Sequence, residues 1–403
     1  MAGSWGSGRR IRAAALAVAA VAGSMVLASS PAVANGTAAP TTGSVVGVER
    51  IAGIDRYETA AMLSEHTYAA PVDVVYIATG ESFPDALAGG PAAAARRGPV
   101  LLVRQNAIPV ATAGELRRLQ PKSIVVLGGS GAVSDAVAGR LLGFTSGTVT
   151  RTAGKDRYET SARISAASNP AGSKIAFVAT GTSFPDALSG TPAASVLGGP
   201  ILLVGGAGIP SSVRAELARL KPDSIFVLGG PGAVSGTVLS ALGPYATSVV
   251  RWSGADRYAT SAAISASVFR GDRTPDTVYV ATGEAFPDAL AGGAVAGFRG
   301  SPLLLVSRTS IPATIRAELT NLRPAHIIIL GGHAAVSEAV KAALAAYVPG
   351  GGQVGSVSGT VRQANTPGVL LANVAVRAYQ RDLGRELWSR NTVTHANGSF
   401  TLT

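Results

Sequence analysis

The residues of this chain most able to do chemistry occur three times, about 100 residues apart. In the first copy they are Asp55, Arg56 and Asp85, within the phrases Gly-x-Asp-Arg-Tyr-x-Thr and Ala-Thr-Gly-x-x-Phe-Pro-Asp-Ala-Leu. A guanidinium binds phosphate or carboxylate through paired hydrogen bonds, and two carboxylates could act as acid and base. Because the same groups are kept three times, the pattern favours multivalent contact over a single catalytic centre.

The elements that position these groups form an α/β pattern. In the first copy we expect strands at 48–52, 73–78, 99–103 and 123–127. Each strand is followed by a helix, and the helices are expected at 55–68, 84–97, 109–119 and 134–142. Val, Ile and Leu runs without alternation are typical of strands buried on both faces, and strands alternating with helices predict a parallel sheet. Ligands bind outside the carboxyl ends of such strands, where the repeated phrases fall.

Each copy therefore predicts an anion-binding rim, where glycine turns present backbone N–H groups at helix N-termini. Tyr57 and Phe83 could add a stacking surface for a sugar. The candidate ligand-binding residues are Arg50, Asp55, Arg56, Thr79, Gly80, Asp85, Gly128 and Gly129; Arg151, Asp156, Arg157, Thr180, Gly181, Asp186, Gly229 and Gly230; and Arg251, Asp256, Arg257, Thr282, Gly283, Asp288, Gly331 and Gly332.

Each candidate also has a structural explanation. Asp55 fits a helix cap, and Asp85 fits the first turn of a helix. Arg56 fits an ion pair with Asp85 or with a neighbouring module, and the aromatic residues fit the core. The co-location of Arg, Asp, Thr and Gly on one rim, in all three copies, favours a binding site without identifying its ligand.

Catalysis and cofactor binding have little support in the sequence. There is no cysteine, and the four histidines do not recur at equivalent positions, so thiol chemistry and a repeated histidine metal site are excluded. The glycine turns lack dinucleotide-binding and P-loop spacing. No third group is placed to orient Asp55 and Asp85. We therefore expect no catalytic residue, no metal and no cofactor.

The first 34 residues have the features of a secretory signal peptide: a basic start, an apolar stretch at 13–27 and Ala32-Val33-Ala34. The apolar stretch is too short to span a bilayer, and both the general secretory and the twin-arginine route stay open. Loss of Arg9, Arg10 and Arg12 lowers the net charge from +11 to +8 (11 − 3). This balance favours an anionic surface as partner. Export, the lack of basic runs and 5% aromatic content argue against nucleic acid.

The chain is expected to contain three tandem modules that pack against one another, because about 100 residues is small for an independent domain. In the tail, strands are expected at 356–361, 373–379 and 399–402. The predicted segments are a signal peptide at 1–34, a linker at 35–44, modules at 45–147, 148–247 and 248–348, a Gly-rich linker at 349–354, and a partial β-sandwich at 355–403.

Together with Pro-(Val/Ile/Leu)-Leu-Leu-Val and Leu-Gly-Gly-x-x-Ala-Val-Ser, the repeated phrases resemble the cell wall binding repeat 2 family over about 300 residues. The resemblance implies Rossmann-like modules with pseudo-threefold packing. It also implies that they hold a secreted protein non-covalently to anionic glycopolymer of the Gram-positive cell wall, teichoic-acid-like or another secondary polymer. One departure is Ala259, which replaces Glu58 and Glu159. The tail is similar to the opening half of a carboxypeptidase regulatory-like β-sandwich, which 49 residues cannot complete.

Two other functions stay open at this level. One is a peptidoglycan hydrolase of the amidase type, or an amidase enhancer, with Asp55 and Asp85 as its carboxylates. The other is a structural surface-layer or adhesive protein whose repeats bind one another. The sequence indicates neither the oligomeric state nor the identity of the polymer.

Overall fold

The computed structural model describes residues 47–349 apart from Ala207 and Phe286, and the backbone of four strands between 357 and 402. The predicted signal peptide at 1–34 and the linker at 35–44 lie outside these residues. The chain divides into two units, of which Gly47–Gly352 is the larger. The two units are described separately below.

The larger unit contains three parallel sheets of four strands each. The first has the order β3(Val100–Val103), β2(Val74–Thr79), β4(Ser123–Leu127), β5(Thr148–Thr152). The second has the order β7(Ile201–Val204), β6(Ile175–Thr180), β8(Ser224–Leu228), β9(Ser248–Trp252). The third has the order β11(Leu303–Val306), β10(Thr277–Thr282), β12(His326–Leu330), β1(Gly47–Ile51). The α/β fold class predicted from the sequence is confirmed.

Helices cover the sheets and fill the centre of the unit. They are α1(Arg56–Thr67), α2(Pro84–Ala95), α3(Val110–Leu119), α4(Asp135–Leu141), α5(Arg157–Ser168), α6(Pro185–Leu197), α7(Ser211–Leu220), α8(Gly236–Leu242), α9(Arg257–Val268), α10(Leu290–Phe298), α11(Ala313–Leu322) and α12(Glu338–Leu344). Short 3₁₀ turns lie at η1(Leu142–Phe144), η2(Gly243–Tyr245), η3(Gly271–Arg273), η4(Pro287–Ala289) and η5(Ala345–Tyr347). In the first copy, every strand and helix end lies within two residues of its expected position.

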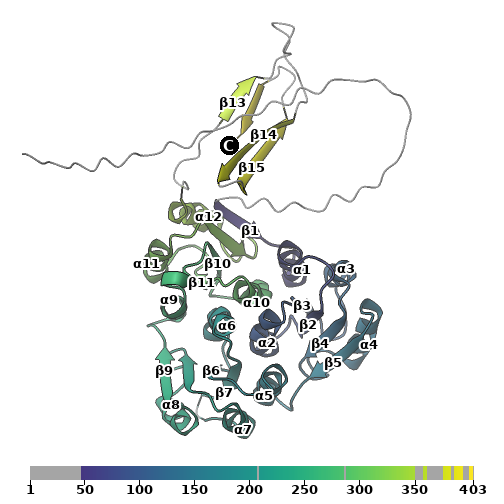
Figure 1. Ribbon diagram of the computed structural model, residues 1–403, viewed down its shortest axis with the longest axis vertical. Coiled ribbons are helices and arrows are strands. Elements are labelled where there is room, and N and C mark those ends of the chain that lie inside the picture. The colour runs from purple at the N-terminus through teal and green to yellow at the C-terminus, as the bar shows by residue number, and fades with distance from the viewer. Residues whose placement is uncertain are drawn as a thin grey trace, which may run out of the picture. The chain divides into compact units, whose positions relative to one another are not determined.

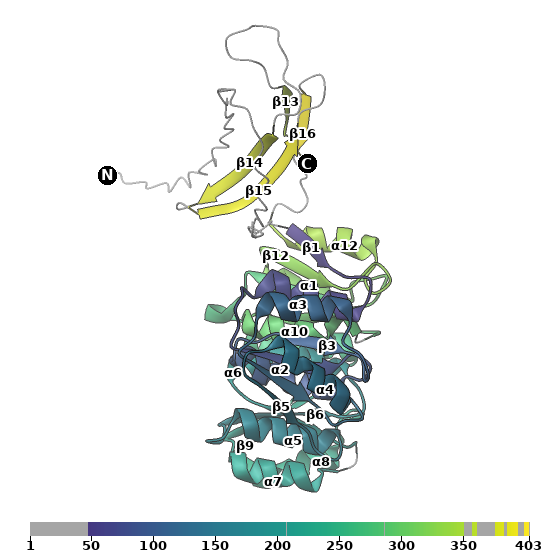
Figure 2. The same ribbon diagram turned by 90° about the vertical axis from the view of Figure 1, so that its right-hand side faces the viewer.

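The centre of the unit is a bundle of α2, α6 and α10, which pack on one another (Figure 1). These helices consist mainly of Ala, Gly, Leu and Pro, and most of their residues are buried. A helix that is apolar on all sides is stable only inside a core, and the three sheets with their outer helices enclose it. Figure 2 shows the same unit from the side, with α1, α3 and α4 facing the viewer.

The sheets and the sequence repeats are offset by one strand. β5 and β9, which begin the second and third copies, pair with β4 and β8 of the preceding copy. β1 pairs with β12, from Gly47↔His326 to Ile51↔Leu330, and so completes the third sheet. The predicted boundaries after residues 147 and 247 therefore separate β5 and β9 from the sheets that they complete. As a result, the three repeats close into a ring.

The smaller unit contributes four strands to the described residues, namely β13(Val357–Thr360), β14(Ala375–Asp382), β15(Arg385–Val393) and β16(Ser399–Leu402). β13 pairs with β16, and β14 with β15, both antiparallel. The three tail strands expected from the sequence are present, and β15 was missed. Its sequence, RELWSRNTV, is mostly polar and has no buried-strand pattern. Within the described residues, no helix is long and apolar enough to cross a bilayer.

Candidate functional site

The aspartates of the Asp-Arg-Tyr phrase cap the helices that follow them. Asp55 is the N-cap of α1, and its Oδ1 accepts hydrogen bonds from the backbone N–H groups of Tyr57 and Glu58, both at 3.0 Å. Asp156 caps α5 in the same way, and Asp256 caps α9 by accepting from the backbone N–H of Ala259. The capping explanation is therefore correct, and these carboxylates satisfy helix N–H groups that would otherwise lack partners.

The arginines that follow these caps lie at the start of each helix and reach across to the next strand of their own copy. The Nη1 groups of Arg56, Arg157 and Arg257 each donate to a glycine carbonyl at the end of β2, β6 or β10, namely Gly80, Gly181 and Gly283. No other hydrogen bond of these guanidinium groups is found within the described residues. Arg157 and Arg257 are exposed, and Arg56 is half-buried. Each copy thus holds an oriented guanidinium with N–H groups free for a ligand.

The glycines that accept these bonds are needed for close packing. A Cβ at Gly80 would lie 2.7 Å from Cε1 of Tyr57 and 3.0 Å from Cδ of Arg56, and Gly181 and Gly283 show the same crowding. The preceding threonines, Thr79, Thr180 and Thr282, are buried, and their hydroxyls accept from the backbone N–H two residues later. These predicted site residues therefore shape the turn below the guanidinium.

The second set of aspartates lies at the start of the central helices. Asp85 packs against Gly128, which has a φ of +96° and at which a Cβ would overlap Oδ2 of Asp85. Burial raises the pKa of the Asp85 carboxyl, and the Arg157 guanidinium of the next copy partly opposes this. The other two copies repeat the arrangement, with Asp186 against Gly229 near Arg257 and Asp288 against Gly331 near Arg56. Each of these carboxylates thus lies near the arginine of the following repeat.

Arg50, Arg151 and Arg251 hold the offset strands in place. Nη1 of Arg50 donates to the carbonyl of Gly331 at 2.7 Å, and its Nη2 donates to Val336 at 2.7 Å and to Glu338 at 2.9 Å. Arg151 donates to Gly128, and Arg251 donates to Gly229 and Val234. The Arg50 side chain is only 9% exposed. These arginines are engaged by backbone carbonyls across the boundary between copies.

The structure divides the predicted rim of each copy between two neighbouring repeats. Arg50 donates to Gly331 and Arg56 lies near Asp288, both of the third copy, whereas Asp85 lies near Arg157 of the second copy. The expectation that all eight residues of one copy share a rim is therefore corrected. The offset strand causes the division, because it carries its arginine into the preceding sheet. The second glycine of each pair remains open, because a Cβ added there would meet no atom closer than 4.0 Å; these glycines are Gly129, Gly230 and Gly332.

The aromatic candidates differ in position. Phe83 packs edge-to-face against Phe184 of the second copy, with ring centroids 6.0 Å apart, so it contributes to packing between repeats. Tyr57 is 4% exposed, and Arg104 lies over its ring, with Cζ 5.0 Å from the centroid. Arg104 was missed by the sequence analysis because it occurs in one copy only. Its position directly after an expected strand was the available signal.

A buried acidic network, also missed, supports each outer helix pair. Glu115 of α3 is 6% exposed and accepts from Ser64 at 2.5 Å and from both ends of the Arg118 guanidinium. Glu216 has the equivalent partners Ser165 and Arg219, whereas Glu318 accepts from Ser265 and from Arg270, which lies after α9. A buried carboxylate is stable only when paired in this way. The network is fully engaged, so it leaves no carboxylate free for a ligand.

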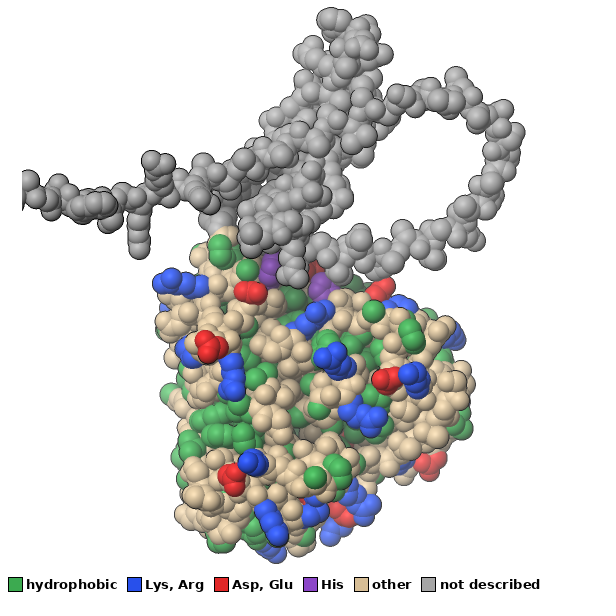
Figure 3. All heavy atoms as spheres, in the orientation of Figure 1, with side chains coloured by type: hydrophobic (Ala, Val, Ile, Leu, Met, Phe, Trp, Pro, Cys, Tyr) green, Lys and Arg blue, Asp and Glu red, His purple; other side chains and the backbone are tan. Residues whose placement is uncertain are grey.

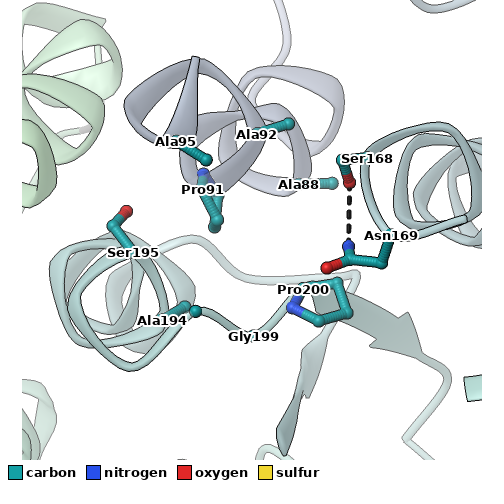
Figure 4. Close-up of a pocket in the computed structure, with 11 residues that line it drawn as sticks. Ala88, Pro91, Ala92, Ala95, Ser168, Asn169, Ala194, Ser195, Gly199 and Pro200 are labelled. Atoms are coloured by element: carbon teal, nitrogen blue, oxygen red, sulfur yellow. Dashed lines mark hydrogen bonds between the residues drawn. The ribbon is translucent and has the colours of Figure 1, made fainter. Parts of the chain in front are cut away.

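A cavity of about 50 Å³ lies between the first and second repeats (Figure 4). Ala95 and Asn169 line it at positions where the third and first copies have Phe298 and Tyr68, whose rings stack at 5.0 Å. The smaller residues leave the space open. The other lining residues are Ala88, Pro91, Ala92, Ser168, Ala194, Ser195, Gly198, Gly199 and Pro200. None is charged, so the cavity lacks the groups that would bind an anion.

The charges on the face shown in Figure 3 are dispersed. Lys and Arg side chains are spread over the repeats, with fewer Asp and Glu among them. Among the described residues, no group of three or more His, Asp or Glu side chains is arranged to hold a metal ion. The arrangement offers separate cationic points, spaced around a ring.

The comparisons with known proteins agree with this architecture. The model of the family "Cell wall binding domain 2 (CWB2)" matches residues 50–138, 151–239 and 251–341, and the chain belongs to this family. Its three repeats are therefore cell-wall-binding modules. The matches begin at the strands that hold Arg50, Arg151 and Arg251.

Two relatives come from Bacillus subtilis (strain 168). N-acetylmuramoyl-L-alanine amidase LytC is 31% identical over 303 residues, covering 75% of this chain and 58% of the relative. An amidase enhancer is 30% identical over 305 residues, covering 75% and 41%. The chain thus spans about half the length of these relatives.

Solved structures with the same fold include Cwp6 and Cwp8 from Clostridium difficile. Cwp6 has a TM-score of 0.71 at 24% identity, covering 77% of this chain and 50% of that one. Cwp8 has a TM-score of 0.68 at 24% identity, covering 75% and 52%. At this level of identity, the two structures establish the fold of the repeats.

Proposed function

We propose that this chain retains a secreted protein at the Gram-positive cell surface by binding anionic wall glycopolymer at three linked places. The observation that carries the proposal is the oriented guanidinium of Arg56, Arg157 and Arg257. Each is fixed through one N–H to a glycine carbonyl and keeps its other N–H groups for a ligand. Each lies in the first turn of its helix, directly after the capping aspartate.

Preorganisation makes these arginines suitable for phosphate or carboxylate groups. A guanidinium that is already held in place loses less side-chain entropy on binding. One such contact provides about 4 kcal/mol, which corresponds to a millimolar dissociation constant. Three linked contacts on one polymer can gain a further factor of about 10² to 10⁴. Tight retention therefore needs no single strong site.

The net charge and the family both support a polyanionic partner. The chain carries a formal charge of +11, or +8 without the three arginines of the signal segment (11 − 3). Teichoic-acid-like and other acidic secondary polymers share the groups that a guanidinium recognises. In this proposal, Arg50, Arg151 and Arg251 are structural, and the polymer contacts the open rim around the other three arginines.

Because one relative is named as an amidase, a peptidoglycan hydrolase is the second candidate function. Against it, Asp55, Asp156 and Asp256 are occupied as helix caps, and Asp85 packs against a glycine turn. We propose that the three repeats bind without catalysis. Zymography on wall material tests this directly, because a zone of clearing by the purified chain would favour the hydrolase.

The test of the binding role is co-sedimentation of the full chain with purified Gram-positive cell walls. Substitution of Arg56, Arg157 and Arg257 together by Gln should abolish sedimentation. Arg163→Gln is the control, since Arg163 on α5 forms an exposed ion pair with Glu159 and donates to no glycine carbonyl in the described structure. Circular dichroism establishes that both proteins are folded. Unchanged sedimentation of the folded triple variant would refute the proposal.

Two further assignments belong to the same proposal. We infer that residues 1–34 direct export, which mass spectrometry of the N-terminus of the cell-surface protein would establish. We also infer that 355–403 is part of a carboxypeptidase regulatory-like β-sandwich. Its described strands pair antiparallel, as that fold requires.

A further inference from the structure

The three arginine sites differ at the residue that follows the third strand of each repeat. This residue is Arg104 after β3, Gly205 after β7 and Ser307 after β11. Arg104 places its guanidinium over the Tyr57 ring, 5.0 Å from the centroid, in a cation–π contact. Glycine and serine have no side chain that could cover a ring in this way. The copies are therefore alike in fold and different at the site.

The exposure of the tyrosines follows this difference. Tyr57 is 4% exposed, whereas Tyr158 and Tyr258 are only partly buried. Within the described residues, no arginine or lysine lies over either of the latter two rings. The adjacent arginines show the same difference in exposure: Arg157 and Arg257 are exposed, whereas Arg56 is half-buried. The second and third repeats thus present a half-buried ring, not covered by a cation, beside an exposed guanidinium.

A second difference separates the second repeat from the third. Glu81 and Glu284 follow the glycine turn in the first and third copies, and the charge of each acts on the hydroxyl of the neighbouring tyrosine. The second copy has Thr182 at this position, with its hydroxyl bonded to Thr180 at 2.9 Å. A carboxylate beside the site repels an anionic ligand. An aspartate of the preceding repeat lies near the arginine in all three sites, but the second repeat lacks this additional carboxylate beside its tyrosine.

We propose that the second repeat holds the principal polymer subsite, in which a sugar ring stacks on Tyr158 while an acidic group of the same polymer reaches Arg157. The third repeat offers a weaker version at Tyr258, because Glu284 opposes the anion. In the first repeat Arg104 covers the Tyr57 ring, so this repeat contributes only its positive charge to polymer binding. This inference rests on the proposed function and adds that the ligand is recognised by its sugar as well as by its charge.

The difference between the first and second repeats can be tested by placing the arginine of the first repeat at the equivalent position of the second. A Cβ at Gly205 would have as nearest neighbours the carbonyl oxygen of Gly208 at 3.6 Å and the hydroxyl oxygen of Tyr158 at 3.8 Å. These are ordinary van der Waals distances, and Gly205 does not have a left-handed φ. Gly205→Arg therefore reproduces the arginine of the first repeat beside Tyr158 without backbone strain. Gly206 has no atom within 4 Å, so Gly206→Arg adds the same charge one residue away.

The test measures the binding of the full chain to purified cell walls, before and after chemical removal of the anionic polymer. Gly205→Arg should weaken binding about tenfold, the effect of losing one of three linked contacts, although it adds a positive charge. Gly206→Arg should bind as tightly as the unsubstituted chain or more tightly. Arg104→Gly, which opens Tyr57, should not weaken binding by more than about twofold.

The outcomes separate this inference from the proposed function. Tighter or unchanged binding by folded Gly205→Arg, with an unfolding midpoint equal to that of Gly206→Arg, would overturn the sugar subsite and leave the charge-based anchoring intact. Equal weakening by Gly205→Arg and Gly206→Arg would also overturn it, because the Tyr158 ring would then make no specific contribution to binding. If the unsubstituted chain binds stripped and intact walls equally, the proposed function fails, and this inference fails with it.

Discussion

At the scale of single residues, a glycine controls where each half-buried aspartate at the start of the central helices lies. Gly128 has a φ of +96°, and its missing side chain leaves room for the Asp85 carboxylate. Gly229 and Gly331 do the same for Asp186 and Asp288. The aspartates therefore sit against the turn of their own repeat and near the arginine of the next. The first glycine of each Gly-Gly pair is a packing residue, and only the second is open.

Gly128→Ala should lower the free energy of unfolding by about 2–4 kcal/mol, because the new Cβ overlaps Asp85 and the backbone is left-handed. Gly129→Ala is the matched control, since its neighbourhood is empty to 4 Å. Urea unfolding of both variants measures the difference. Equal stability of the two would show that the turn does not need the first glycine.

The raised pKa of Asp85 predicts a pH dependence of stability. Burial raises the pKa above its ordinary value of 3.8, so the folded state holds the proton more tightly than the unfolded chain does. The contribution of this carboxyl to stability therefore falls as pH rises from about 3.8 through the raised pKa, and the penalty is complete above it. Arg157 reduces the penalty without removing it.

Asp85→Asn removes the titrating group and should therefore stabilise the protein more at about pH 7 than at about pH 4. Urea unfolding of the variant and the unsubstituted chain at both pH values gives the two differences in free energy. Asp272→Asn, at an exposed position of η3, serves as a control for general charge effects. A gain that is the same at both pH values would contradict the raised pKa of Asp85.

At the scale of elements, arginine side chains fasten the offset strands. Arg251 on β9 donates to the carbonyls of Gly229 at 2.6 Å and Val234 at 2.8 Å, beyond the end of β8. Burial lowers the pKa of its guanidinium, which has no acidic partner in the described structure. A charged donor on two partly buried carbonyls contributes more than a neutral hydrogen bond does. The offset strand is thus held by its side chain as well as by its ladder.

Arg251→Gln should cost about 1–3 kcal/mol of stability, because it leaves at least one carbonyl without its charged donor. Arg163→Gln, which breaks only the exposed pair with Glu159, should cost about 0.5 kcal/mol or less. Thermal unfolding of the two variants compares them. A larger loss for Arg163→Gln would mean that Arg251 does not fasten β9.

At the scale of the whole unit, the ring closes through β1. Gly47–Ile51 pairs with His326–Leu330, which lies at the opposite end of the repeat array in sequence. No local signal reveals this contact, because it joins segments almost 280 residues apart and depends on how the three repeats pack. The strands and helices were predictable from their periodicity and from their Pro and Gly positions. The strand with which the first strand of each copy pairs was not predictable in this way.

The same reason explains which site residues were predictable. The repeated phrases identified Arg56, Arg157 and Arg257, since identical residues at identical spacing indicate equivalent positions. They left open whether each arginine pairs with the aspartate of its own copy or with a neighbouring module, and only the packing of the repeats brings Asp85 near Arg157. Arg104 occurs in one copy only and so left no repeat signal; its position directly after an expected strand was the one indication of it.

Removal of residues 1–52 should destabilise the unit by about 3 kcal/mol or more, because it deletes the β1 ladder, the buried Ile51 and the Arg50 contacts. Removal of 1–46 leaves β1 intact and is the control. Differential scanning calorimetry compares the two truncated chains. Equal transition temperatures would contradict closure of the ring by β1.

The central claim is that oriented arginines, repeated three times, bind an acidic wall polymer. The most direct measurement is sedimentation of the full chain with intact and polymer-stripped cell walls, as salt is raised from about 0.15 M to about 1 M and the Debye length falls from about 8 Å to about 3 Å. The account predicts binding to intact walls that weakens steadily with salt and is absent from stripped walls. Retention that is equal on stripped walls, or unchanged at about 1 M salt, would contradict it.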